Sequence, residues 1–135
     1  MIEHSINIRV RYSETDHMHY VYYGNYAQYF EMGRAEWLRN LGITYKNIED
    51  SGIMLPVLDL HIRYHKPATY DELLKLTTKV VKKPTVKIEF EHSICNQDNE
   101  LLTSGKSILV FIDKKRNRPT RVPAYFLDII KPFFS

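Results

Sequence analysis

One carboxylate stands out for its chemistry because it lies in a polar loop just ahead of a helical pattern. Asp16 belongs to the loop Ser13-Glu14-Thr15-Asp16-His17-Met18, and apolar residues with helical spacing begin about six residues later, near Tyr22. The start of a helix presents free N–H groups and the positive end of the helix dipole. A carboxylate beside such donors can attack a carbonyl that they polarise, or activate water against it. Capping of the helix by Asp16 is the structural alternative, and the spacing alone leaves both hypotheses open.

The histidines form two close groups, but neither group completes a metal site. His17 and His19 lie beside Asp16, whereas His61 and His65 lie four residues apart on the polar face of an expected strand. A tetrahedral zinc site needs more ligands than either group supplies, so solvated histidines and no metal are predicted. The sequence also lacks a nucleophile elbow, a phosphate-binding loop and a dinucleotide fingerprint.

The composition is that of one ordinary globular domain, which we expect to span residues 1–135. The chain has a mass of 16.0 kDa and 19 Lys and Arg against 16 Asp and Glu, a net charge of +3 that is too small to demand nucleic acid. The single cysteine, Cys95, excludes an intrachain disulfide framework. No apolar run approaches the ~20 residues of a membrane span, and the N-terminus has no signal-peptide core. A cytoplasmic protein without a nucleic-acid or membrane partner is therefore expected.

The periodicity of apolar residues predicts an α+β architecture. Alternation predicts a strand over 6–10, and spacings of about four and seven predict a long helix from Tyr22 to Leu41, ended by Gly42. Gly33 on the apolar face would let this helix approach a sheet closely. Four further strands are expected, with apolar faces that comprise Leu58, Leu60, Ile62 and Tyr64; Leu74, Leu76, Thr78 and Val80; Val86, Ile88 and Phe90; and Leu102, Ile108, Val110 and Ile112.

Short connections predict that these four strands are antiparallel neighbours along the chain. One short helix is expected over 44–50 and another over 126–130, where Pro132 stops it. The strand over 86–94 contains no proline, so it could pair with its own copy at a sheet edge.

The stretch Tyr12-Ser13-Glu14-Thr15-Asp16-His17-Met18-His19-Tyr20-Val21-Tyr22-Tyr23-Gly24-Asn25-Tyr26 resembles the active-site segment of hotdog-fold acyl-CoA thioesterases. The group that it resembles is the 4-hydroxybenzoyl-CoA thioesterase family, including its YbgC-like branch. A second similar stretch runs from Tyr64 to Leu73, and the resemblance extends from about Ile6 to Val122. It implies a hotdog fold, in which a five-stranded curved antiparallel sheet wraps one long central helix.

The resemblance also implies an activity and a set of site residues. Asp16 falls on the catalytic aspartate, and the backbone N–H of Tyr23 on the group that polarises the thioester carbonyl. Asn25 and Tyr26 match the residues that shape the helix start, and Tyr22 is assigned with them to substrate binding. Many YbgC-like members carry His where this chain has Tyr23, whereas the 4-hydroxybenzoyl branch carries Tyr, and many also have Gly where this chain has His19. The implied reaction is hydrolysis of an acyl-CoA to free acid and CoA without a cofactor; the alternatives are an acyl carrier protein thioesterase and a non-catalytic acyl-CoA-binding protein.

Two basic clusters at strand ends complete these expectations. In the family, basic residues near such turns contact the phosphates of CoA, which implies a binding role for Lys82, Lys83, Lys114, Lys115 and Arg116. Solvated hairpin ends are the alternative explanation for both clusters. Hotdog thioesterases pair edge strands and build each active site at the subunit boundary, so the resemblance implies a homodimer or a homotetramer.

Overall fold

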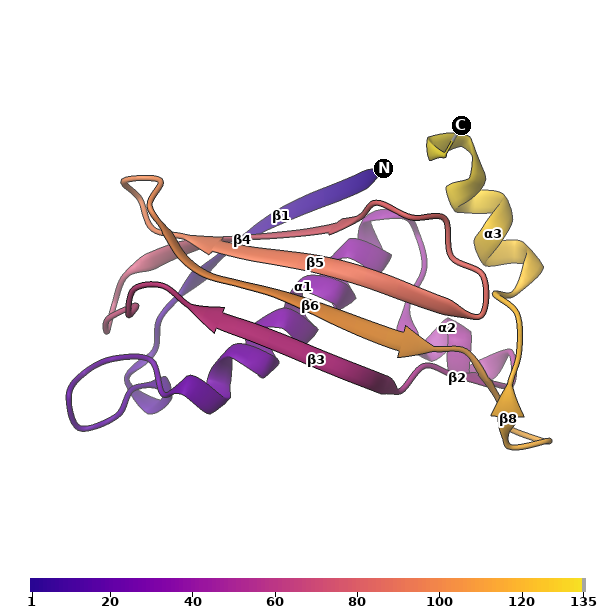
Figure 1. Ribbon diagram of the computed structural model, residues 1–135, viewed down its shortest axis with the longest axis horizontal. Helices are drawn as coiled ribbons and strands as arrows, with labels where there is room; N and C mark the ends of the chain where they lie inside the picture. Colours follow the sequence, from indigo (N-terminus) through magenta and orange to yellow (C-terminus); the bar gives the residue numbers. More distant parts are fainter. Residues whose placement is uncertain (135) are drawn as a thin grey trace.

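The computed structural model describes residues 1–134, in which a curved antiparallel sheet packs one face against a long helix (Figure 1). The helix is α1 (Tyr26–Asn40), preceded by a 3-10 helix at Tyr23–Asn25. The five strands lie in the order β1 (Ile2–Arg9), β4 (Leu73–Val80), β5 (Lys87–Cys95), β6 (Leu101–Val110) and β3 (Val57–Tyr64). The predicted α+β hotdog architecture is confirmed.

Smaller elements close the end of the sheet that lies away from the start of α1. Helix α2 (Tyr45–Asp50) begins at Thr44, whose hydroxyl accepts the Asn47 N–H at 3.0 Å. A second sheet consists of β2 (Ile53–Met54), β7 (Ile112–Asp113) and β8 (Arg118–Pro119). The chain then forms α3 (Ala124–Ile130) and a 3-10 helix at Lys131–Phe133. Figure 1 places α2, β2 and β8 at one end and the loop before α1 at the other.

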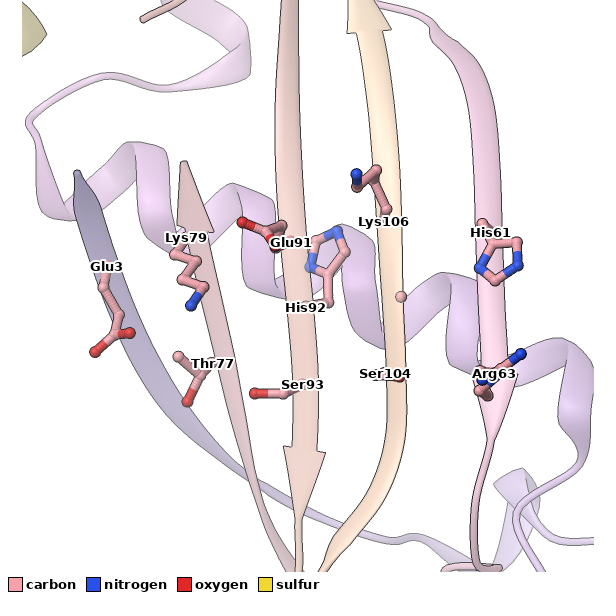
Figure 2. Close-up of a pocket in the computed structure, with 11 residues that line it drawn as sticks. Glu3, His61, Arg63, Thr77, Lys79, Glu91, His92, Ser93, Ser104 and Lys106 are labelled. Atoms are coloured by element: carbon pink, nitrogen blue, oxygen red, sulfur yellow. The ribbon is translucent and has the colours of Figure 1, made fainter. Parts of the chain in front are cut away.

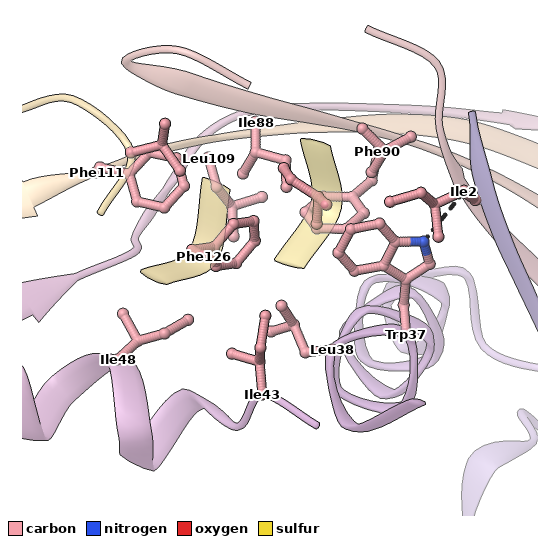
Figure 3. Packing of buried hydrophobic residues seen from close by; sticks show 13 residues of the cluster. Ile2, Trp37, Leu38, Ile43, Ile48, Ile88, Phe90, Leu109, Phe111 and Phe126 are labelled. Atoms are coloured by element: carbon pink, nitrogen blue, oxygen red, sulfur yellow. Dashed lines mark hydrogen bonds between the residues drawn. The ribbon is translucent and has the colours of Figure 1, made fainter. Parts of the chain in front are cut away.

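Helix α1 carries a glycine where it meets the sheet, and the space there leaves no room for a side chain. A Cβ atom on Gly33 would lie 2.8 Å from Leu76 Cδ2 and would also collide with the Thr78 hydroxyl. On the same side of the helix, Phe30 and Trp37 are completely buried. The Trp37 indole N–H donates a hydrogen bond of 3.1 Å to the Ile2 carbonyl, which fastens the helix to β1 (Figure 3). The role expected of Gly33 is confirmed.

The aromatic core lies between the sheet and both of the later helices. Trp37 packs edge-on against Phe90 with ring centroids 5.2 Å apart, and Phe111 packs against Phe126 of α3 at 5.7 Å. Figure 3 shows Ile48 of α2 facing the same cluster. The small elements therefore cover the end of the core that α1 leaves open.

The predicted strand neighbours are wrong for β3. Only β4, β5 and β6 follow one another in space; β3 pairs with β6, and β4 pairs with β1. The segment between Tyr64 and Leu73 is not a hairpin but a crossing, held to the loop before α1 by the Val21 N–H on the Ala68 carbonyl and by the Tyr70 N–H on the His19 carbonyl. These contacts connect segments far apart in sequence, so the local turn residues could not reveal them.

The structure also corrects two expectations about strand faces and one about a strand edge. Leu58 and Leu60 were expected in the core, but they are 56% and 40% exposed because β3 is an edge strand. The strand over 86–94 was a candidate edge, yet β5 is paired on both sides. In β6 the buried residues include Ser107 and Leu109, and Phe111, directly after the strand, is buried as well. Of the expected face, Leu102 and Val110 are buried, but Ile108 and Ile112 are only partly buried. The polar Ser107 belongs to the interior, which a search for apolar alternation cannot recognise.

A polar network lies buried between α1 and the sheet. The Arg34 Nη1 donates to the Ser107 hydroxyl at 3.2 Å, and His92 Nε2 lies 2.8 Å from the same hydroxyl. His92 stacks on Phe30 with ring centroids 4.2 Å apart. Burial, and to a smaller extent the charge of Arg34, lowers the pKa of His92 to about 3. The imidazole is therefore neutral near pH 7, and Arg34 carries the charge of the network.

Candidate active site

The Asp16 carboxylate lies in a tight turn that fixes one of its two oxygens. Asp16 Oδ1 accepts the N–H of Met18 at 2.9 Å and the N–H of Tyr20 at 3.3 Å. The backbone N–H of Asp16 donates to the Tyr20 carbonyl at 2.8 Å, which closes the turn. Within residues 1–134, no protein group hydrogen-bonds to Oδ2. One oxygen thus orients the half-buried carboxylate, and the other is left to meet a substrate or a water molecule.

His19 adopts a backbone conformation that favours glycine. Its φ angle is +67°, in the left-handed region that L-residues other than Asn and Asp adopt at some energetic cost. The His19 N–H donates to the Asp16 carbonyl at 2.9 Å, so this conformation is part of the turn that holds the carboxylate. The ring of His19 is exposed and is not among the groups that line the site.

Tyr23 is the first residue of the 3-10 helix that leads into α1. The first N–H groups of a helix have no acceptor within it, and they carry the positive end of its dipole. The Tyr64 hydroxyl donates to the Tyr23 carbonyl at 3.1 Å and so fixes the residue that carries this N–H. The Tyr23 N–H is therefore a donor of the kind that stabilises an oxyanion.

Asp16 and Tyr23 line one surface hollow of about 380 Å³. Its other wall comes from the end of β3 and the segment after it, and the complete lining is Asp16, Tyr20, Val21, Tyr23, Tyr26, Tyr64, His65, Lys66 and Pro67. Of the wall after β3, Lys66 pairs with Glu100, and His65 Nε2 lies 2.9 Å from the Ser104 hydroxyl. Tyr64, His65 and Lys66 were not among the residues expected in the site, although the second family-like stretch contains all three.

Three other predicted residues have distinct positions. Tyr26 is almost fully buried and lines the hollow; burial raises its pKa, so its hydroxyl stays protonated. Asn25 lies outside the lining and donates from Nδ2 to the Glu14 carbonyl at 2.8 Å, which is a positioning role. Tyr22 is exposed beside Tyr23, and a hydrogen bond with Tyr23 raises the pKa of Tyr22.

The two basic clusters lie at the other end of the sheet from Asp16 of the same chain. Lys82 and Lys83 follow β4, and Lys114, Lys115 and Arg116 form the turn between β7 and β8 (Figure 1). All five side chains are exposed. Lys82 lies 3.6 Å from the carboxylate of Glu89. Within one chain, therefore, the structure does not bring either cluster to the Asp16 hollow.

A second hollow, of about 470 Å³, lies on the face of the sheet away from α1. Figure 2 shows Glu3, Lys79, Glu91 and Lys106 on this face, one each on the neighbouring strands β1, β4, β5 and β6. Both signs of charge alternate there, and no residue of the Asp16 loop lines it. Across residues 1–134 no group of three metal-ligating side chains occurs, and no helix is long and apolar enough to cross a membrane.

Comparison with known proteins identifies the family. A model of the thioesterase-like superfamily matches residues 10–130. YneP of Bacillus subtilis, named as an acyl-CoA thioesterase, is 34% identical over 121 residues that cover 90% of this chain and 88% of YneP. The acyl-CoA thioesterase YbgC of Haemophilus influenzae is 31% identical, and the match covers 88% of each chain. A solved DHNA-CoA thioesterase from Staphylococcus aureus superposes with a TM-score of 0.89 at 36% identity, covering 98% of this chain and 89% of that one.

The chain therefore belongs to the thioesterase-like superfamily, whose hotdog fold it shares. The expected resemblance to hotdog and YbgC-like thioesterases is confirmed, as is the expected enzyme class, a thioester hydrolase.

Replacement of Asp16 tests its predicted catalytic role. In Asp16→Asn the amide oxygen can still accept the N–H groups of Met18 and Tyr20, so we expect the loop and the thermal stability to be retained. The variant loses the negative charge, and a positioned general base contributes roughly 10²–10⁴-fold to rate. We expect kcat to fall by that factor in a continuous assay of thiol release from acyl-CoA.

The matched control is Asp98→Asn, which removes an exposed carboxylate from the turn between β5 and β6. It should retain the wild-type kcat. An Asp16→Asn protein that is correctly folded and as active as the wild type would rule out Asp16 as the catalytic carboxylate.

Proposed function

We propose that the protein hydrolyses the thioester of an acyl-CoA to the free acid and CoA, with Asp16 as the catalytic carboxylate and the Tyr23 N–H as the oxyanion donor. The observation that carries this proposal is the hollow that Asp16 and Tyr23 line together. Acyl-CoA is the substrate class for which YneP and YbgC are named.

The geometry supports a short reaction sequence. The thioester carbonyl oxygen accepts the Tyr23 N–H, which stabilises the negative charge that develops on it. Asp16 Oδ2 either removes a proton from an attacking water molecule or attacks the carbonyl carbon itself and forms an anhydride that water then cleaves. The C–S bond breaks as CoA leaves as a thiolate, which is a good leaving group. This chemistry requires no cofactor.

A thiol-release assay with a panel of acyl-CoAs tests the proposal against its alternatives. A non-catalytic acyl-CoA-binding protein would bind these compounds without turnover. An acyl carrier protein thioesterase would turn over the carrier-bound thioester with a much higher kcat/KM than the CoA thioester of the same acid. The panel should include DHNA-CoA, the compound named for the Staphylococcus aureus relative, and 4-hydroxybenzoyl-CoA, the substrate implied by the finer family assignment.

The proposed functional unit is a dimer formed through β3, or a tetramer of two such dimers. Strand β3 pairs only with β6, so its other edge is free, and Val57, Leu58 and Leu60 along it are 40% exposed or more. The opposite edge strand, β1, presents polar residues such as Glu3 and Asn7. Free strand edges with apolar side chains favour pairing, and a two-fold axis is the commonest symmetry of homodimers.

A charged β3 edge should dissociate this dimer. We expect the double variant Leu58→Lys, Leu60→Lys to be monomeric at micromolar concentration by light scattering, because like charges would face each other across the two-fold axis. Activity should fall by at least about 100-fold, since a misplaced site can cost that much in rate. The control, Asn7→Lys on β1, should keep the wild-type mass and activity. A fully active monomer would contradict the proposal.

In the proposed dimer, pairing of two antiparallel β3 strands would bring only one of the two basic clusters near the Asp16 hollow of the partner. The Val57 end of each strand then lies beside the Tyr64 end of its partner. Lys114 is near the Val57 end, because its N–H donates to the Gly52 carbonyl just ahead of β2. Lys82 and Lys83 lie after β4, on the other side of the sheet from β3. We therefore propose that the turn Lys114–Arg116 meets the phosphates of CoA bound to the partner, and that Lys82 and Lys83 contribute less.

Neutralising each cluster separately tests this difference. The triple variant Lys114→Gln, Lys115→Gln, Arg116→Gln should raise KM and spare kcat, because the phosphates are remote from the reacting carbon. The effect should shrink as salt is added, since exposed charges are screened over about 8–10 Å. The double variant Lys82→Gln, Lys83→Gln is the matched control and should change KM less. An unchanged KM in the triple variant would reduce this turn to a solvated hairpin end.

We further propose a cytoplasmic location. The single cysteine, Cys95, is a free, half-buried thiol, and such thiols are compatible with a reducing compartment. Fractionation of the producing cells tests this assignment.

A further inference from the structure

A third hollow, which we call the Arg34 hollow, lies beside α1 at the Val57 end of β3. Its volume is about 540 Å³, and its lining is Glu31, Arg34, Tyr45, Ile48, Glu49, Ile53, Met54, Leu55, Pro56, Val57 and Leu109. Most of these side chains are apolar, and Arg34 is the cation among them. A concave, largely apolar site with a few converging polar groups is typical of a small-molecule site.

Arg34 is a buried cation whose hydrogen bonding is incomplete. It is only 5% exposed, and its Nε has no hydrogen-bond partner. Its Nη1 donates to the neutral hydroxyl of Ser107, and no carboxylate of residues 1–134 lies within 4.0 Å of the guanidinium. Tyr45 is the other polar group nearby: burial raises the pKa of its hydroxyl, while the charge of Arg34 and a hydrogen bond from it act in the opposite direction. The protein thus leaves at least one buried donor without an acceptor.

An unsatisfied buried donor is energetically costly, more so on a charged group, so a ligand that supplies an acceptor recovers that free energy on binding. The charge at the mouth of the hollow limits what this ligand can be. Glu31 and Glu49 are exposed and also line the hollow, so its carboxylates outnumber its single cation. A second anion would be repelled by them, whereas a neutral oxygen would not. A hydroxyl suits the site best because it can accept from the guanidinium and donate to the Tyr45 oxygen.

The proposed dimer connects this hollow to the reacting carbonyl. Val57 lines the Arg34 hollow, and Tyr64, at the opposite end of β3, lines the Asp16 hollow. Both hollows border α1 on its β3 side, since Tyr64 packs against Tyr26 and Arg34 reaches Ser107 of β6. Two antiparallel β3 strands place the Val57 end of one chain beside the Tyr64 end of the other. The Asp16 hollow of one subunit therefore faces the Arg34 hollow of its partner.

We infer that the Arg34 hollow is a specificity subsite that binds a neutral oxygen, above all a hydroxyl, at the end of the acyl group remote from the thioester. The substrate class is then an oxygenated acyl-CoA. Arg34 and Tyr45 act as specificity-determining residues and take no part in the bond-breaking step. The inference rests on the proposed thioesterase function and on the β3 dimer.

A ladder of matched substrates tests the inference. Wild-type kcat/KM is measured for ω-hydroxyacyl-CoAs and for unsubstituted acyl-CoAs of equal length, from about four to about ten carbons, and for ω-carboxyacyl-CoAs. We expect the ratio of hydroxylated to unsubstituted substrate to peak at one length at about 10-fold or more, because a hydrogen bond to a charged group is worth ~1.5–3 kcal/mol. No turnover of any acyl-CoA would overturn the proposed function itself. Turnover without a peak, or a peak for the carboxylates, would overturn only the present inference.

Variants of Arg34 and Tyr45 then test whether these two residues cause the preference for the hydroxylated substrate. Arg34→Met should lower the hydroxyl preference by at least about 10-fold at the peak length, and Tyr45→Phe, which removes one hydroxyl, by about 3–10-fold. Lys46→Met is the matched control, because this exposed cation of α2 does not line the hollow, and the preference should persist. If Arg34→Met fails to fold, the hydroxyl preference of Tyr45→Phe alone tests the inference. Equal losses on both substrates would show that Arg34 and Tyr45 have structural roles only, and would overturn the inference.

Discussion

The site depends on one buried carboxylate that does no chemistry. Glu14, only 7% exposed, accepts the Arg11 N–H at 2.8 Å and the Tyr29 hydroxyl at 3.0 Å through Oε1. Its backbone carbonyl accepts the N–H of Tyr22 and the side-chain amide of Asn25. These four hydrogen bonds join Glu14 to three segments: Arg11 just after β1, Tyr22 and Asn25 at the start of the helical segment, and Tyr29 in the first turn of α1. Burial and the Glu14 charge raise the pKa of Tyr29, so its hydroxyl remains a donor.

This constraint explains why a loop can hold a catalytic carboxylate in place. Asp16 lies two residues after Glu14, and Tyr23 lies one residue after Tyr22, so both functional groups are close in sequence to an anchored residue. The packing of α1 at Gly33 then sets the height of the helix above the sheet. The Tyr64 hydroxyl donates to the Tyr23 carbonyl, which connects the edge strand β3 to the start of this helical segment. Hydrogen bonds therefore connect the catalytic loop, the start of the helix and the strand at the proposed subunit boundary.

The sequence predicted those features that depend on neighbouring residues. Apolar spacing located α1, and alternation in β4 and β5 identified their buried faces, because one face of each meets the helix. Alternation did not identify the buried face of β3, whose apolar residues lie along a free edge, or that of β6, whose interior includes Ser107. Strand order depends on the crossing after Tyr64, and its anchors at Val21 and His19 are distant in sequence. For the same reason Asp16 and Tyr23 were assigned from a contiguous motif, whereas Tyr64, His65 and Lys66 were missed.

The buried polar network between α1 and the sheet is energetically unfavourable, because the Nε of its charged Arg34 has no hydrogen-bond partner. His92 could share Ser107 with Arg34 only as a neutral ring, since burial and the neighbouring cation both oppose its protonation. Arg34 remains charged with neutral partners, although replacing such buried ionic groups by apolar ones often stabilises a protein. Retaining an unsatisfied cation beside a hollow is understandable if a bound molecule completes its hydrogen bonding.

The most direct test of the account is a crystal structure of the protein with a non-hydrolysable acyl-CoA analogue, in which a methylene group replaces the thioester sulfur. The account predicts that the ketone oxygen lies about 3 Å from the backbone nitrogen of Tyr23, as expected for an N–H···O hydrogen bond, with its carbonyl carbon facing Asp16 Oδ2. It also predicts that a second subunit encloses the acyl group. A ketone bound away from Tyr23, or an acyl group held wholly within one chain, would contradict it.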